Sequence, residues 1–119
     1  MNSKSNSLVF LTALFTTVPV LNAQTMVSTV AGTGSAGNTD GIGTGASFYT
    51  PAACTFYQQD KYILVGTYTN IRKIEYSTWT VTTLAGDNSG AFLNGVGTNA
   101  RFSLARGIVV TSDNSAACC

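Results

Sequence analysis

An ungapped repeat with an offset of 54 residues is the feature that most constrains how this chain can fold. Segment 27–48 aligns with segment 81–102, and ten of the 22 aligned positions are identical. A fixed repeat period indicates copies of one supersecondary unit stacked along the chain. The positions that define the repeat motif are Gly32, Asp40, Gly41, Gly43 and Phe48 in the first copy, and Gly86, Asn94, Gly95, Gly97 and Phe102 in the second.

The residues of one repeat unit predict β-strands. Residues 62–65 and 71–76 are rich in β-branched and aromatic side chains, and residues 80–84 alternate polar with apolar side chains. A weaker strand is expected over 52–57, with 107–111 as its counterpart in the next repeat. Four short antiparallel strands followed by a glycine-rich loop fit one blade of a β-propeller.

Three sequence motifs, in the order in which the family has them, resemble NHL repeats, a family of β-propeller blades. They are Ile-Arg-Lys-Ile over 71–74, Val-Thr-Thr-Leu-Ala-Gly over 81–86 and Asn-Gly-Val-Gly-Thr-Asn-Ala-Arg-Phe over 94–102. The first copy supplies its own versions at 27–32 and 40–48. The resemblance covers roughly residues 26–114 and implies an all-β fold. The expected form is a partial propeller, in which one four-stranded antiparallel blade is flanked by strands of its two neighbours.

The sequence also departs from the family pattern. NHL repeats commonly read Pro-x-Gly before their first strand, whereas this chain reads Pro51-Ala-Ala in one copy and has Ala105 in place of the proline in the other. Gly66-Thr67-Tyr68 stands where the family usually has an acidic residue. A closed propeller needs at least four blades, and this chain holds fewer than two. We therefore expect either a fragment of a longer protein or an assembly of several chains.

Residues 1–23 have the three-part layout of a secretory signal peptide. A polar start that carries Lys4 precedes an apolar run over 8–21, and Ala23 provides a small residue at the cleavage position. We expect a signal helix ended by Pro19, and cleavage before Gln24. The run is shorter than the ~20 residues that span a bilayer. An uncleaved anchor or a buried helix are the alternatives.

Cleavage would leave a propeller fragment over 24–114, a disordered tail over 115–119 and no stable membrane span.

Charged residues are only 9% of the chain, which has no histidine and a net charge of +1. The missing histidines remove the usual general base and the commonest metal ligand. A nearly neutral chain also lacks the clustered positive charge that is needed to bind along the phosphate backbone of a nucleic acid. We expect no catalytic residue, cofactor, metal site or nucleic-acid partner.

Several repeated residues have a structural and a functional interpretation. Asp40-Gly41 and Asn94-Gly95 are expected to shape turns, with glycine at positive φ, and a cation-binding loop is the alternative. Phe48 and Phe102 are expected to be buried between neighbouring blades, and a ligand-facing role is the alternative.

Strand geometry separates Arg72 from Lys73, because successive residues face opposite sides of a sheet. Arg72 is expected to face a neighbouring blade and Lys73 to face solvent. The aromatic residues Tyr57, Tyr62, Tyr68, Tyr76 and Trp79 fit strand positions, and a binding face is the alternative. In a secreted chain, Cys54 is expected to form a disulfide with Cys118 or Cys119.

These features predict a non-catalytic, secreted or cell-surface NHL-type segment that binds an unidentified protein or glycan through loops on one face. Two alternatives remain open. In the first, the chain is a fragment of a lyase-type propeller enzyme, although such enzymes hold metal with histidines that this chain lacks. In the second, it is the truncated ectodomain of a receptor-like membrane protein. Unfinished blades also predict self-association or further blades in a longer parent chain.

Overall fold

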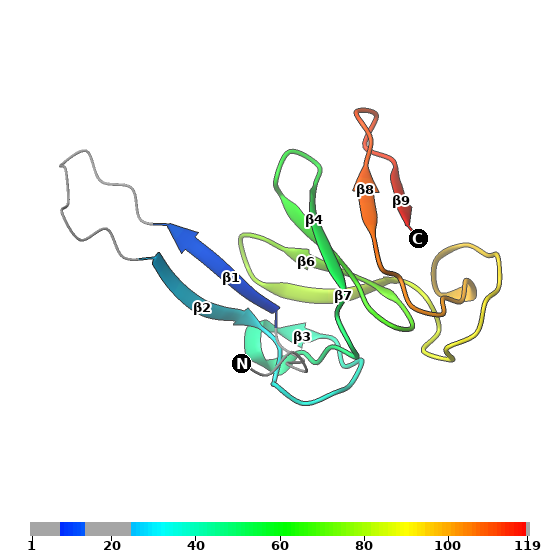
Figure 1. The fold of residues 1–119 in the computed structure, drawn as a ribbon, viewed down its shortest axis with the longest axis horizontal. Helices are drawn as coiled ribbons and strands as arrows, with labels where there is room; N and C mark the ends of the chain where they lie inside the picture. The colour runs from blue at the N-terminus through cyan, green and yellow to red at the C-terminus, as the bar shows by residue number, and fades with distance from the viewer. Residues whose placement is uncertain (1–7, 14–24, 119) are drawn as a thin grey trace.

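A five-stranded antiparallel sheet forms the centre of the molecule (Figure 1). The computed structural model describes residues 8–13 and 25–118. The strand order in the sheet is β3-β7-β6-β5-β4, so that four strands follow one another as a meander. The bounds of the five strands are Gly41–Ile42 for β3, Ala53–Tyr57 for β4, Tyr62–Gly66 for β5, Ile71–Glu75 for β6 and Thr80–Ala85 for β7.

The all-β expectation is confirmed, and the four meander strands lie where the sequence predicts them. The β5 run Tyr62–Gly66 is buried from Ile63 onward, because neighbouring strands flank it on both sides. The fifth strand was not predicted. Gly41–Ile42 comes from the glycine-rich loop and pairs with Val81 and Thr80 at the outer edge of β7. The loop of one repeat is thus joined by backbone hydrogen bonds to the sheet that follows it.

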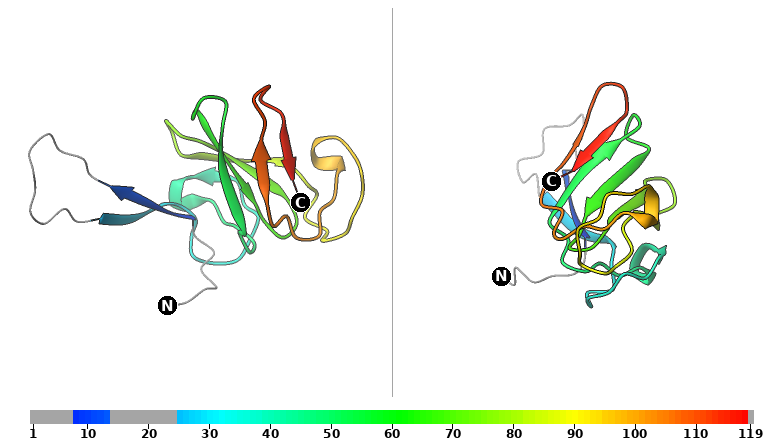
Figure 2. Two further views of the ribbon diagram at one scale, coloured as in Figure 1. Left: turned by 45° about the horizontal axis from the view of Figure 1, so that its top comes forward. Right: turned by 90° about the vertical axis from the view of Figure 1, so that its right-hand side faces the viewer.

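A second hairpin continues the repeat beyond the central sheet. Strand β8 (Ile108–Val110) pairs with β9 (Ala116–Cys118). An offset of 54 residues places these strands on 54–56 of β4 and 62–64 of β5. The hairpin lies beside β4 in both figures (Figures 1 and 2). The tail was expected to be disordered over 115–119, but pairing with β8 orders residues 116–118, and Cys119 lies outside the described residues.

The N-terminal segment differs from the expected signal helix. Leu8–Ala13 forms strand β1, which pairs antiparallel with β2 (Thr25–Ala31). The segment contains Val9, Phe10 and Thr12, residue types that favour strands when an edge is available for pairing. Residues 1–7 and 14–24, and with them the expected cleavage position, lie outside the described part. Among the described residues, no helix has the length and apolar character needed to cross a membrane.

The two repeat copies share the same backbone hydrogen bonds where each strand enters its loop. The amide of Gly32 donates to Gly43 O at 3.1 Å, and the amide of Gly86 donates to Gly97 O at 3.1 Å. Each copy then forms one turn of 3₁₀ helix, η1 over Gly43–Gly45 and η2 over Gly97–Asn99. The residues before these turns have nearly the same dihedral angles, −107° and 127° at Ile42 against −112° and 131° at Val96.

The glycines of the repeat motif serve two different purposes. Gly43 and Gly97 have φ values of 54° and 57°, which favour glycine. Positive φ was expected at Gly41 and Gly95 instead, and that expectation is wrong. At these two positions a Cβ would lie only 2.9 Å from Gly45 O and 2.6 Å from Asn99 O, so glycine is needed for close backbone approach.

Phe48 and Phe102 differ in their surroundings. Phe48 is fully buried against one face of the sheet, in a core with Ile63, Val65, Ile74 and Val81. Phe102 is only half-buried and lies on the opposite face. The prediction that both rings are buried is therefore correct for Phe48 alone. The two phenylalanines lie on opposite faces of one sheet, and the buried hydrophobic cluster forms on the face that carries Phe48.

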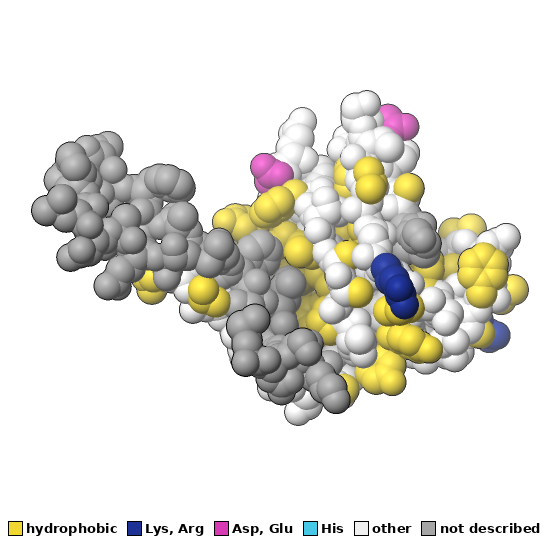
Figure 3. All heavy atoms as spheres, viewed as in Figure 1, with side chains coloured by type: hydrophobic (Ala, Val, Ile, Leu, Met, Phe, Trp, Pro, Cys, Tyr) yellow, Lys and Arg dark blue, Asp and Glu magenta, His cyan; other side chains and the backbone are white. Residues whose placement is uncertain are grey.

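The second face of the sheet retains an apolar groove of about 280 Å³. On the side of the molecule seen in Figure 3, hydrophobic side chains are widespread and charged side chains are few. The groove is lined by Leu64, Ile71, Leu84, Ala85, Phe102, Ile108 and Ala116. An open groove of this kind beside short strands favours association with other chains.

We predict that residues 24–119, produced alone, form dimers or larger species in size-exclusion chromatography. Leu84 is 42% exposed in the groove, and Leu84→Glu is expected to shift the chain toward the monomer because it places a charge in the apolar contact. Thr82→Glu, on the same strand at another exposed position, is the control and should leave the elution unchanged. A sharp wild-type monomer peak with cooperative melting would contradict the prediction.

Candidate functional site

The meander places its connections at two opposite ends of the sheet. The turns over 58–61 and 76–79 lie at one end, which we call the turn end. The 67–70 turn lies at the other end, which we call the loop end, together with residues 38–40 and 47–52 of the first loop and with the second loop at 86–107. Gly43 of the first loop instead lies beside the turn end, where its N donates to Trp79 O at 2.9 Å. The left view of Figure 2 shows the β4–β5 turn above the sheet and the second loop, in yellow and orange, to the right of the sheet. Each end gathers a different set of polar and aromatic residues.

The buried guanidinium of Arg72 joins the first loop to the sheet. Arg72 comes from β6 and is completely buried, yet it contacts three groups of the loop. Its Nη1 donates to Ser47 O at 2.7 Å, and its Nη2 donates to Thr39 O at 3.0 Å and to Asp40 Oδ1 at 2.6 Å. The guanidinium also lies over the Phe48 ring, 5.4 Å from its centroid. Lys73 points to the opposite face, as predicted from strand geometry, and lies over Tyr62.

Asp40 acts as an anchor to the sheet. Its Oδ1 accepts hydrogen bonds from Arg72 and from the Thr83 hydroxyl on β7 at 3.0 Å. This role was missed in the sequence, where Asp40 was interpreted as a turn residue. The signal that could have found it is the combination of an arginine at an inward position of a strand with an acidic residue in the loop that covers that strand. Replacement of this acid by Asn94 in the second copy removes the charge there.

A buried polar cluster centres on Asn70 at the loop end. The Thr67 hydroxyl donates to Asn70 Oδ1 at 2.6 Å, and both side chains are fully buried. The Asn70 amide group then donates to Asn38 Oδ1 at 3.3 Å in the first loop and to Asn88 Oδ1 in the second. Asn70 therefore joins both repeat loops to one turn. Gly86, at φ 102°, allows this approach, because a Cβ there would lie 2.4 Å from Thr69 O.

The loop end also carries exposed aromatic rings. Tyr49 and Tyr68 are 41% and 36% exposed, and their rings pack edge to face with centroids 5.8 Å apart. The backbone holds both residues in place, since Tyr68 N donates to Tyr49 O at 3.0 Å and Leu104 N donates to Tyr68 O at 2.6 Å. Phe92, in the second loop, is 79% exposed. The loop end thus presents aromatic side chains on a backbone held in place by hydrogen bonds.

The second loop has its own ion pair. Asp87 accepts hydrogen bonds from Arg101 Nε and from the amide of Ser89. The hydrogen bonds from Ser89, together with Arg101, hold the pKa of the Asp87 carboxyl below its usual value. The carboxylate is therefore charged at neutral pH, and it braces the loop that carries Phe92.

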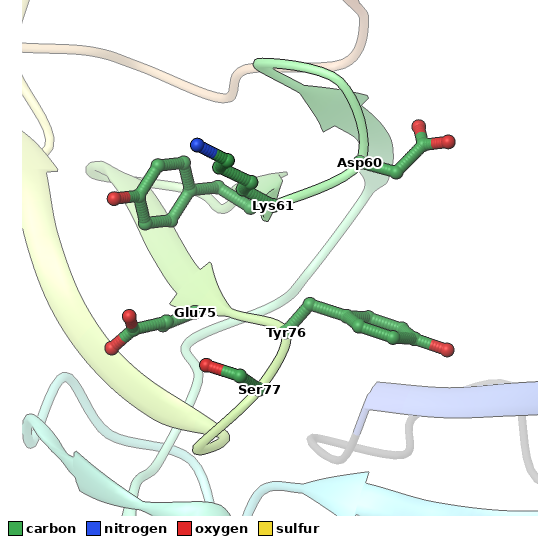
Figure 4. A pocket seen from close by; sticks show the side chains of 6 residues that line it. Asp60, Lys61, Glu75, Tyr76 and Ser77 are labelled. Atoms are coloured by element: carbon green, nitrogen blue, oxygen red, sulfur yellow. The ribbon is translucent and has the colours of Figure 1, made fainter.

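The remaining aromatic residues singled out in the sequence gather at the turn end. Tyr62 and Tyr76 line a pocket of about 340 Å³ together with Asp60, Lys61, Glu75 and Ser77 (Figure 4). Tyr57 and Trp79 contact the rings of Tyr62 and Tyr76 respectively. The predicted aromatic set is thus divided between two surfaces, with Tyr68 alone at the loop end.

Two further expectations concern cysteine and metal chemistry. Cys54 is a free, exposed cysteine on β4. Cys118 lies on β9 and Cys119 lies outside the described residues, so pairing of Cys54 with either tail cysteine stays a prediction. Over 26–117, where the side chains are described, no group of three or more His, Cys, Asp or Glu residues gathers in a way that could hold a metal ion.

No family model matches the chain, and no curated protein matches it significantly. The resemblance to NHL repeats therefore stays a prediction from the sequence motifs, and the matching backbone hydrogen bonds show only that the two copies share a conformation.

We predict that Arg72→Met lowers the free energy of unfolding by about 3 kcal/mol, because it removes three hydrogen bonds and leaves the buried Ser47 carbonyl without its donor. Asp40→Asn should cost only about 1–2 kcal/mol, since Asp40 is half-exposed and the surrounding water screens its charge. Urea titration followed by circular dichroism measures both values.

The matched control is Lys73→Met, the neighbouring cation on the same strand. Its side chain is only half-buried and faces the other side of the sheet, so the free energy of unfolding should change by less than about 1 kcal/mol. Equal destabilisation by Arg72→Met and Lys73→Met would show that the buried guanidinium does not hold the loop.

Proposed function

We propose that this chain is a non-catalytic, secreted or cell-surface segment of an NHL-type β-propeller that binds a protein or glycan through its loop end, with a protein as the favoured partner. In this proposal β4–β7 form the complete blade. The β8–β9 hairpin begins the next blade, and β2 is the last strand of the preceding one. Residues 1–23 act as a signal peptide, and the mature chain begins at Gln24.

The observation that carries the proposal is the combination of exposed aromatic rings with a buried polar support. Tyr49 and Tyr68 are exposed, while Asn70, in the same turn as Tyr68, is completely buried and hydrogen-bonded to both loops. Tyrosine and tryptophan dominate the energetics of protein interfaces, and rigid presentation lowers the entropy lost on binding. Phe92, in the second loop, is a third exposed aromatic ring.

The charge pattern also supports a binding role that does not depend on phosphates or metals. At the loop end Arg72 is buried against Asp40, and Arg101 is engaged by Asp87. These two cations are therefore neutralised within the protein, whereas Arg106, exposed in the second loop, is in no ion pair among the described residues. Contacts with a partner would come from aromatic and amide groups, which suits a protein surface better than a strongly charged ligand.

The test is binding of the purified secreted chain to cells that display candidate partners, together with sequencing of its N-terminus. We expect saturable binding by a chain that begins at Gln24. Tyr68→Ala should weaken this binding about tenfold, as loss of a central interface tyrosine does. Tyr76→Ala, a tyrosine of similar exposure at the turn end, is the control and should bind as the wild type does.

Two outcomes would contradict the proposal. One is binding that Tyr68→Ala and Tyr49→Ala leave unchanged. The other is turnover of a hydrolase or lyase substrate by the purified chain, which would favour the enzyme alternative. Recovery of the chain from membranes with Met1 intact would contradict the assignment of residues 1–23 as a cleaved signal.

A further inference from the structure

The ribbon formed by β1 and β2 has no role at the loop end. It projects away from the central sheet in Figures 1 and 2 and is a sheet of two strands only. Met26 and Val27 on β2 are 63% and 61% exposed, whereas Val81, the repeat counterpart of Val27, is fully buried in the core. A two-stranded ribbon with so little packing is marginally stable. Its two strands therefore depend mainly on the pairing of their backbones.

Strand β1 pairs with β2 in the same register as β6 pairs with β7. Residues 8, 9, 10 and 11 lie opposite residues 31, 29, 28 and 27 of β2. Residues 71, 72, 73 and 74 lie opposite residues 85, 83, 82 and 81 of β7, so each partner differs by the repeat offset of 54. The irregularity of the register also falls at the same place, after residue 8 in β1 and after residue 71 in β6. Strand β1 thus occupies on β2 the position that β6 occupies on β7.

The sequences of β1 and β6 agree at two of these four positions. Leu8 and Leu11 stand where β6 has Ile71 and Ile74, and both isoleucines are buried. The two residues between them differ completely, since they are Val-Phe in β1 and Arg-Lys in β6. Strands that bind to a sheet edge gain affinity from backbone hydrogen bonds and specificity from a few side chains. The edge of this repeat therefore selects a large aliphatic residue at the first and fourth positions.

The position of β2 does not depend on β1 alone. Ala31, the last residue of β2, is fully buried in the core that contains Phe48. Directly after the strand, Gly32 N donates to Gly43 O at 3.1 Å. Removal of residues 1–23, as proposed above, would take β1 away and leave the edge of β2 anchored at one end but unpaired. An unpaired strand edge is a template for pairing with another chain.

We propose that the edge of β2 binds an extended segment of a partner protein, which takes the place of β1 once residues 1–23 have been removed. The segment runs antiparallel to β2 and carries Leu or Ile at two positions three residues apart. A second copy of this chain does not supply its β6, because that strand is already paired on both sides by β5 and β7. The opening of the site rests on the cleavage proposed above, whereas the fit of the segment does not.

The full chain tests the fit of the segment without cleavage. The probe is a fluorescein-labelled peptide with the sequence of residues 69–77, which contains β6, and fluorescence anisotropy measures its binding. Val9→Pro combined with Phe10→Pro frees the edge, because adjacent amides point to opposite sides of a strand and one proline removes a donor toward β2. This β1 variant should bind the peptide at least tenfold more tightly than the wild type, in which β1 fills the edge. Ser3→Pro, outside β1, is the matched control and should bind as the wild type does.

A second pair of prolines shows where the peptide binds. Ser28→Pro with Thr29→Pro on β2, added to the β1 variant, should abolish binding for the same reason. A peptide with aspartate at both isoleucine positions should bind the β1 variant at least tenfold more weakly than the original peptide. Trp79 packs against the core and is the only tryptophan of the chain, so its emission reports whether the central sheet stays folded. If the prolines on β2 unfold the sheet, the aspartate peptide decides the result.

The proposal is overturned if the β1 variant binds the peptide no more tightly than the wild type does. It is also overturned if the peptide still binds after the prolines are placed on β2, or if the aspartate peptide binds equally well. The purified secreted chain separates this proposal from the cleavage. A chain that begins at Gln24 and binds the peptide as the β1 variant does supports both. A chain that begins at Gln24 and does not bind overturns the site and leaves the cleavage intact, whereas a secreted chain with Met1 overturns the cleavage and the opening of the site.

Discussion

Burial of the Arg72 guanidinium is the constraint on which the arrangement of this fold depends. A buried cation is costly unless its charge and donors find partners. Here Nη1 and Nη2 donate to two carbonyl groups and one carboxylate of a single glycine-rich loop, while Nε has no hydrogen-bond partner among the described residues. The loop must therefore lie across β6 with Asp40 at the edge of β7. In that position Phe48 covers the apolar face of the sheet, and Gly41–Ile42 can pair with β7. One ionic contact thus determines how the loop, the core and the fifth strand fit together.

The rest of the loop end follows from this placement. With the first loop held by Arg72, Asn38 lies within reach of Asn70, and Asn70 in turn contacts Asn88 of the second loop. The second loop lacks the acidic residue, because Asn94 occupies the position of Asp40. Its closure depends on the Asp87–Arg101 pair and on the backbone bridge between Leu93 and Arg101. The two copies therefore share a backbone conformation but differ in the ion pair that holds each loop. This difference accounts for the different burial of Phe48 and Phe102.

Much of the strand pattern could be predicted from sequence because it depends on local periodicity. Residues 62–65 and 71–76 are rich in β-branched and aromatic side chains, and residues 80–84 alternate polar with apolar side chains. Both patterns are typical of β-strands. Strand β3, the role of Asp40 and the polar cluster at Asn70 could not be predicted, because each depends on contacts between residues 18 to 43 positions apart. Strand β1 and the ordered tail were missed because pairing with a neighbouring strand overrides composition. Similarly, the aromatic residues were recognised as a set, but only the fold divides them between two opposite ends.

Hydrogen exchange of individual amides in the unmodified chain tests the central claim most directly. If Arg72 holds the first loop as part of the sheet, the amide of Ser47, which donates to Thr39 O at 3.0 Å, should exchange as slowly as the amides of β5 and β6, within about tenfold. The amide of Ser89, in the second loop, should exchange much faster because its residue is exposed and its bond is local. Exchange of Ser47 at the rate of Ser89, while β5 and β6 remain protected, would show that the loop opens independently of the sheet and would contradict the account.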